Sequence, residues 1–203
     1  TLAEWQPGVR IVAKRKSGNY WKPGRGNFDT VELRYIGDAS ARTQALVTGQ
    51  VDAVNRLDPK TVALLSKNKN INVVRTKGTG NRFAFVAHTD IDPFKNRDLM
   101  LALKYGIDRK KIVDNVFSGY ASLGNDHTVG PANKYFDAKQ AMRPYDPEKA
   151  KFHLKKSGFA GAIELQVSEG AFSGATDSAV VFQESFKKAG GNLDVMRGSG
   201  DGF

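Results

Sequence analysis

The pattern that most restricts the fold lies near the end of the chain. Residues 163–167 form a short apolar segment typical of a strand, and the apolar residues of 180–186 are spaced as on a helix that stops at Gly190-Gly191. Residues 193–196 are a second strand-like segment. A strand, a helix and a strand in this order favour two parallel strands joined by a crossover helix. We therefore predict an α/β fold.

Helix starts are indicated where Asp or Ser precedes an apolar run. Asp58-Pro59 and Asp146-Pro147 are typical starts, because Asp caps the first turn and Pro suits the first helical position. Ser40 and Asp108 are the predicted caps of two further helices, and 99–105 is predicted as a helix that ends at Gly106. Further strands are predicted at 9–14, 31–35, 51–54, 71–74 and 83–86. The alternation within 31–35 predicts that one face of that strand is buried.

Composition excludes several classes of protein. The 203 residues include no cysteine, which removes disulfides, thiolate catalysis and Cys-ligated zinc or iron–sulfur sites. Apolar residues make up 40% and charged residues 26%, as in an ordinary globular protein. The chain has no apolar run of the ~20 residues that a spanning helix needs. No signal peptide is visible at Thr1, so if the protein is secreted its signal lies outside this chain, which we expect to be a piece of a longer protein.

The positive charge is concentrated in the first part of the chain. Residues 1–88 hold 15 Lys and Arg against 6 Asp and Glu, a net charge of +9, whereas residues 89–203 hold 16 against 15, a net charge of +1. A basic surface suits nucleic acid, anionic lipid or an acidic ligand, but it is also typical of an ordinary solvated face. A basic nucleic-acid-binding module is therefore kept as the alternative function.

Few residues of the chain are candidates for catalysis or metal binding. The three histidines are His88, His127 and His153, of which His88 is expected in a hydrogen-bonded structural role and His153 on a helix surface. Asp126 and His127 are residue types used in metal sites and proton relays, but they also suit a polar turn. No catalytic constellation has a local signature, so we predict no catalytic residue, no metal site, no cofactor and no enzymatic activity.

Three passages carry a resemblance to a known family. They are Trp5-Gln6-Pro7-Gly8 with Asn19-Tyr20-Trp21; Ala41–Leu46 with Gly49-Gln50-Val51-Asp52-Ala53; and Pro93-Phe94, Ala102–Tyr105, Ile107-Asp108-Arg109 and Gly119-Tyr120 followed by Tyr145-Asp146-Pro147-Glu148-Lys149-Ala150. In this order, over almost all of its length, the chain resembles the middle of a family 5 solute-binding protein, the peptide- and nickel-type receptor of ATP-driven bacterial importers.

The resemblance implies a two-lobed, periplasmic binding protein-like II fold, present here as an incomplete fragment that covers parts of both lobes. Residues 1–88 would belong to the first, strand-rich lobe and residues 89–203 to the second, α/β lobe. The implied function is that of the substrate-binding component of an ABC-type importer. It captures a small polar solute, a peptide or related compound, between the lobes and delivers it to a membrane permease. The implied location is the periplasm.

The resemblance also places a set of residues near the ligand. Their expected roles are backbone and side-chain hydrogen bonds to a polar solute, with Phe83 as an apolar wall. The residues are Thr79, Gly80, Asn81, Phe83, Asn125, Asp126, His127 and Asp201.

Overall fold

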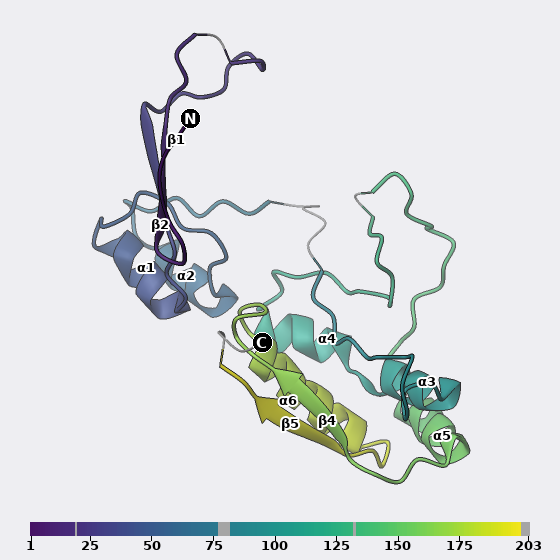
Figure 1. Ribbon diagram of the computed structural model, residues 1–203. Helices are drawn as coiled ribbons and strands as arrows, with labels where there is room; N and C mark the ends of the chain where they lie inside the picture. The colour runs from purple at the N-terminus through teal and green to yellow at the C-terminus, as the bar shows by residue number, and fades with distance from the viewer. Residues whose placement is uncertain (19, 77–81, 132, 200–203) are drawn as a thin grey trace. The chain divides into compact units, whose positions relative to one another are not determined.

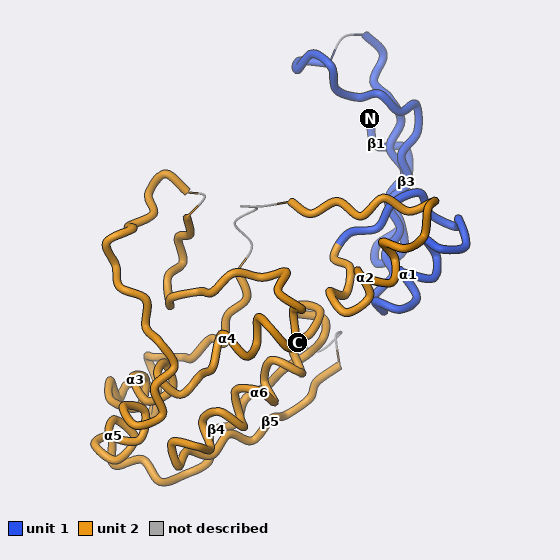
Figure 2. The backbone as a smooth tube through the Cα atoms, turned by 180° about the vertical axis from the view of Figure 1, so that it is seen from behind, with its two compact units in different colours: residues 1–55 blue, residues 56–203 orange. Residues whose placement is uncertain are grey.

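The chain divides into two compact units. The computed structural model describes residues 1–18, 20–76, 82–131 and 133–199. Unit 1 comprises residues 1–55 and unit 2 comprises residues 56–203, and the two are coloured separately in Figure 2. These units are defined by their internal contacts, and they need not coincide with the lobes that close around a ligand. The lobe boundary between residues 88 and 89 therefore stays a prediction.

Unit 1 is built on a three-stranded antiparallel sheet, whose strands are labelled in Figures 1 and 2. Its strands β1 (Leu2–Gln6), β2 (Arg10–Lys14) and β3 (Thr30–Arg34) are neighbours in chain order. Trp5 pairs with Ile11 and Ile11 with Leu33, so these three residues share one face of the sheet. They are 65%, 38% and 61% exposed, so the predicted burial of one face of the third strand is wrong within the described residues. The reason is that the helix of this unit does not pack broadly on the sheet.

The helix of unit 1 is α1 (Ala39–Val47). Its N-cap is Asp38, whose carboxylate accepts a hydrogen bond from the backbone nitrogen of Ala41 at 2.7 Å, so the predicted Ser40 cap is wrong by two residues. Residues 51–54, predicted as a strand, have no strand pairing in the described structure. The backbone nitrogen of Val51 instead donates to the Ala45 carbonyl, which holds the segment against the end of α1.

Unit 2 contains most of the helices. They are η1 (Pro59–Thr61), α2 (Val62–Leu65), α3 (Arg97–Gly106), α4 (Arg109–Lys111), the π-helical turn η2 (Ile112–Val116), α5 (Pro147–Ser157) and α6 (Ala175–Lys187). The predicted caps Asp58, Asp108 and Asp146 each accept a backbone hydrogen bond from the first turn, which confirms these three helix starts. Gly158 ends α5 with a φ of 70°, a conformation that glycine adopts without strain.

The strand–helix–strand unit near the end of the chain is confirmed. Strands β4 (Ile163–Val167) and β5 (Leu193–Arg197) pair in parallel, and α6 connects them (Figure 1). The predicted strands at 71–74 and 83–86 are wrong, since both segments lack strand pairing in the described structure. A short β-branched segment forms a strand only where a neighbouring strand completes its hydrogen bonds.

The main core of unit 2 lies between α3, α5, α6 and the two strands. Leu99, Phe186 and Leu193 are at most 2% exposed within it. The ring of Phe186 fills space that two glycines leave open, because a Cβ on either Gly106 or Gly191 would overlap that ring. Helix α3 packs along α5 (Figure 1).

Candidate functional site

Phe83 belongs to an aromatic cluster of unit 2. Its ring stacks on Phe172 with centroids 4.4 Å apart and on Phe117 with centroids 5.8 Å apart. Phe83 is nevertheless 55% exposed, so it presents apolar surface that the cluster does not cover. Phe172 carried no sequence signal of its own, because it stands alone in a loop.

The predicted polar residue Asn125 joins two stretches of one loop. Its side-chain Nδ2 donates to the Ala141 carbonyl at 2.6 Å, and its Oδ1 accepts from the backbone nitrogen of Arg143 at 2.6 Å. The amide therefore holds residues 141–143 against residue 125. Its role as a ligand-binding residue stays a prediction.

The carboxylate of Asp126 lies between two arginines. Its Oδ1 accepts from Arg109 Nη2 at 2.5 Å, and its Oδ2 accepts from Arg143 Nη1. The three side chains are only 19%, 17% and 26% exposed, respectively. Asp126 has a φ of 58°, a conformation that Asp and Asn tolerate better than most residues. Two guanidinium groups share one carboxylate, so this cluster keeps a positive charge.

His127 lies beside the ring of Phe136, with ring centroids 6.4 Å apart. Because aromatic pairs within 7 Å attract each other, this contact is one element that positions the imidazole. His88 does not have the expected hydrogen bond. Its side chain is 81% exposed, and its Nδ1 lies 4.0 Å from Asp90 Oδ1, which is too far for a hydrogen bond. The expected structural role of His88 is therefore wrong.

Two of the predicted groups of site residues come together in unit 2. The Nε of Arg82 donates to the Thr128 carbonyl at 2.7 Å. Because Arg82 precedes Phe83 and Thr128 follows His127, this bond holds the two predicted segments side by side. The other four predicted residues, Thr79, Gly80, Asn81 and Asp201, lie outside the described residues.

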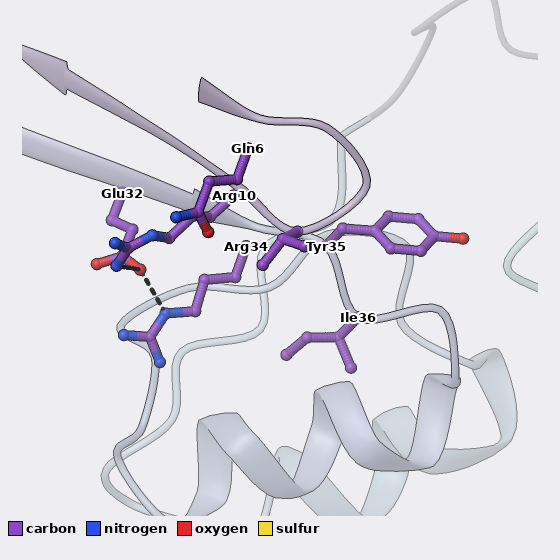
Figure 3. Close-up of a pocket in the computed structure, with 7 residues that line it drawn as sticks. Gln6, Arg10, Glu32, Arg34, Tyr35 and Ile36 are labelled. Carbon is purple, nitrogen blue, oxygen red and sulfur yellow. Dashed lines mark hydrogen bonds and ion pairs between the residues drawn. The ribbon is translucent and has the colours of Figure 1, made fainter. Parts of the chain in front are cut away.

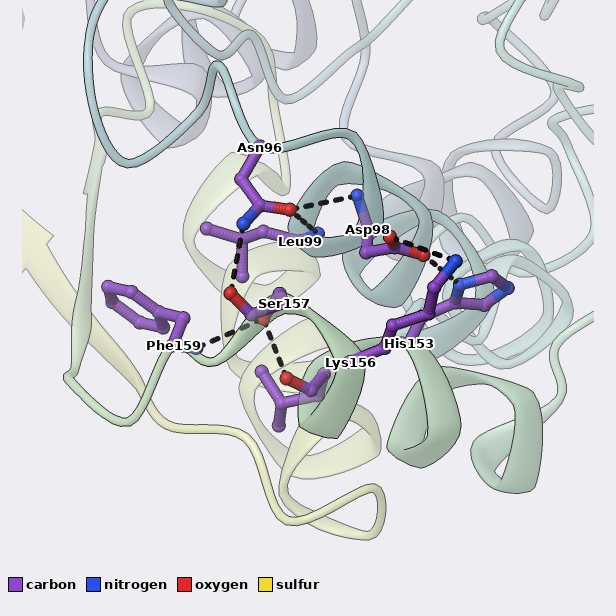
Figure 4. A network of polar contacts seen from close by, with 8 residues as sticks. Asn96, Asp98, Leu99, His153, Lys156, Ser157 and Phe159 are labelled. Atoms are coloured by element: carbon purple, nitrogen blue, oxygen red, sulfur yellow. Dashed lines mark hydrogen bonds and ion pairs between the residues drawn. The ribbon is translucent and has the colours of Figure 1, made fainter.

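A separate polar network joins α3 to α5 (Figure 4). His153 Nδ1 lies 2.8 Å from Asp98 Oδ1, and Lys156 Nζ lies 3.2 Å from Asp98 Oδ2. The hydrogen bond with His153, followed by that with Lys156, holds the pKa of the Asp98 carboxyl below its usual value. The His153 side chain is only 18% exposed, so its predicted place on a helix surface is wrong.

The same network caps α3. The Oδ1 of Asn96 accepts from the backbone nitrogens of Asp98 and Leu99, and its Nδ2 donates to the Ser157 carbonyl at 2.9 Å. A hollow of about 280 Å³ lies beside it. The hollow is lined by Asp92, Pro93, Asn96, Leu99, Ser157, Gly158 and Phe159. The polar side chains here hold one helix to the other, and none of them is a predicted ligand residue.

Unit 1 has a hollow of its own, of about 360 Å³ (Figure 3). It is lined by Gln6, Val9, Arg10, Glu32, Arg34, Tyr35 and Ile36. Glu32 accepts from Arg34 Nε at 2.8 Å, and this hydrogen bond lowers the pKa of Glu32. Arg10 Nη1 lies 3.6 Å from the same carboxylate. The charged groups of this hollow are thus paired with one another along the sheet.

Neither a metal site nor a membrane-spanning helix is seen in the described part of the chain. It contains no group of three or more His, Cys, Asp and Glu side chains placed to hold a metal ion. Within the same residues, no helix has the length and apolar character needed to cross a membrane.

Comparison with protein families gives one match over almost the whole chain. The model of the bacterial extracellular solute-binding proteins, family 5 Middle, matches residues 1–201. The glutathione-binding protein GsiB of Salmonella paratyphi A is 32% identical over 158 residues, which are 78% of this chain and 30% of that protein. GsiB of Escherichia coli O6:K15:H31 is 33% identical over 149 residues, which are 73% of this chain and 28% of that protein. The chain thus spans about 30% of the length of these relatives.

Solved structures show the same fold. NikZ from Campylobacter jejuni, in complex with Ni(L-His), superposes with a TM-score of 0.85 at 21% identity, over 100% of this chain and 42% of that one. The periplasmic binding protein DppA from Helicobacter pylori, in complex with the peptide STSA, gives a TM-score of 0.78 at 22% identity, over 98% and 38% of the two chains. The predicted fold class, α/β and periplasmic binding protein-like with only part of the fold present, is confirmed.

Proposed function

The chain belongs to the family 5 bacterial extracellular solute-binding proteins, and we propose that it is the central part of the substrate-binding component of an ABC-type importer. The single observation that carries this proposal is the family match over residues 1–201. Relatives that cover most of this chain, and solved structures of the same fold, are solute-binding proteins. The comparisons give no support to the alternative, a basic nucleic-acid-binding module.

The proposed ligand is a small polar solute, a peptide or a related compound. Relatives and structures of the same fold are described as binding glutathione, the peptide STSA and Ni(L-His). The arrangement around Phe83 suits such a solute, because an exposed aromatic face adjoins a loop rich in hydrogen-bonding groups. We place the ligand at Phe83 and at the loop of Asn125, Asp126 and His127, together with the predicted Thr79, Gly80, Asn81 and Asp201.

The proposed protein binds and releases its solute without chemical change. We propose that it works in the periplasm and hands the solute to a membrane permease, as fits a family of extracellular solute-binding proteins. Catalysis would require a nucleophile or a paired acid and base within reach of the solute. No such constellation has a recognisable signature in the sequence, which supports a binding role.

The test is a ligand screen on the full-length protein. Thermal stability is measured with glutathione, dipeptides, Ni(L-His), opines and sugars, each at several concentrations. A ligand that binds the folded state raises the unfolding temperature in proportion to the logarithm of its concentration. We expect stabilisation by at least one peptide or related compound, and no loss of that compound on prolonged incubation. A well-folded sample that no solute stabilises would contradict the proposal.

A further inference from the structure

Arg82 carries a guanidinium group whose position is fixed by the loop that it contacts. Its Nε donates to the Thr128 carbonyl at 2.7 Å. Its terminal nitrogens lie against the backbone of Gly130, where they fill space that a side chain would take, because a Cβ at Gly130 would overlap them. Gly130 itself is buried. The loop therefore positions the guanidinium through Nε and through its contact with Gly130, while Arg82 as a residue stays exposed.

The terminal nitrogens of Arg82 have no acidic partner among the residues that the structure describes. This sets Arg82 apart from the other ordered arginines of the site, since Arg109 and Arg143 both pair with Asp126. With Nε occupied, Nη1 and Nη2 form a two-pronged donor that matches the two oxygens of a carboxylate. A fixed guanidinium binds such a group better than a mobile one, because less side-chain freedom is lost.

The surroundings of Arg82 are positive and partly apolar. The pair of arginines around Asp126 keeps a net positive charge on the same loop. Phe83, the next residue in the chain, offers an exposed aromatic face. An organic anion with an apolar portion is the chemistry that fits this combination.

We propose that Arg82 is a carboxylate-binding residue of the ligand site, and that the solute is therefore an organic acid such as a peptide with a free carboxyl group. This inference rests on the proposed function and makes it more specific. Thr128 and Gly130 then act as positioning residues, because they hold the guanidinium without needing to touch the solute.

The test measures affinity in the full-length protein by calorimetry. The probes are glutathione and the dipeptide Met-Leu, each as the free acid and with its carboxyl groups amidated. Replacing Arg82→Ala should raise the Kd of a bound free acid at least about tenfold, since a charge-assisted bidentate pair is lost. The amidated probe should change less than about twofold. The control is Lys151→Ala, which removes one positive charge from an exposed position of α5.

A second variant moves the guanidinium without removing it. Gly130→Ala places a Cβ where the terminal nitrogens of Arg82 lie, so it should also weaken binding of the free acid. In the double variant, the Gly130→Ala change should add no further loss, because both act through one group. Equal affinity of wild type and Arg82→Ala, or an equal loss with the amidated probe, would overturn this inference alone. A wild-type protein that binds neither probe would contradict the proposed peptide ligand, and this inference with it.

Discussion

Asp126 offers the sharpest test of how the loop of residues 119–143 is held. Replacing Asp126→Asn keeps the shape of the side chain and suits the backbone, since Asn tolerates the φ of 58° found there. The substitution removes the charge that attracts Arg109 and Arg143. Arg109 also donates to the Lys104 carbonyl at 3.1 Å, so Asp126 connects the loop through this arginine to α3.

The expected cost follows from these contacts. A hydrogen bond to a charged group contributes about 1.5–3 kcal/mol. The Asp126 carboxylate is 19% exposed, which reduces the value, and Asn can still accept one hydrogen bond from an arginine. We therefore expect the loop to lose about 2 kcal/mol of local stability. That corresponds to an about 30-fold larger population of the opened loop.

The assay is hydrogen exchange of the backbone amides in residues 119–143, measured by mass spectrometry on the full-length protein. Exchange in this segment should accelerate about 30-fold, while peptides from α6 and β4 stay unchanged. The matched control is Asp137→Asn in the same loop, because Asp137 accepts a hydrogen bond from the backbone of Lys139 and has no ion pair among the described residues. Unchanged exchange in Asp126→Asn would refute the idea that this carboxylate holds the loop.

Three further predictions concern the framework of unit 2. Gly106→Ala should cost about 1–3 kcal/mol, because its Cβ overlaps the buried ring of Phe186, and an unaltered urea midpoint would contradict this. The lowered pKa of Asp98 stabilises the fold above the usual aspartate pKa, and this contribution is lost as pH falls through the lowered value. Thermal unfolding at several pH values should therefore show that Asp98→Asn loses less stability on acidification than the wild type. Equal pH profiles of the two proteins would argue against this. Gly158→Ala should cost about 1 kcal/mol because of its φ of 70°, whereas Gly158→Asn should cost less; equal melting temperatures of the two variants would be inconsistent with a backbone cause.

Elements governed by neighbouring residues were predictable. The caps at Asp58, Asp108 and Asp146 depend on a side chain that bonds a backbone nitrogen two or three residues ahead, and all three are present. The strand–helix–strand order of 163–197 was also predicted correctly, since its apolar spacing and its glycines mark each element. The predicted strands at 51–54, 71–74 and 83–86 are wrong, because a strand depends on a partner that sequence periodicity does not reveal.

The contacts around the proposed ligand site were predictable only in part. Phe83 and the segment 125–127 were selected from the sequence, and the contact between Arg82 and Thr128 holds their two segments together. Arg82 itself, Phe172 and the pairing of Asp126 with two arginines were missed. Each of these depends on contacts between residues far apart in the chain, and a lone Arg or Phe in a loop has no local pattern that marks it.

The sequence by itself determined the α/β class, the capped helix starts and, through its ordered motifs, the resemblance to solute-binding proteins. These properties follow from periodicity and from short-range hydrogen bonds. Only the tertiary structure decided which charges are paired and which are available. It brought Asp126 between Arg109 and Arg143, and it fixed Arg82 against Gly130 without an acidic partner among the described residues. The physical reason is that an ion pair requires approach within about 4 Å, and in this loop that approach depends on the folding of residues many positions apart.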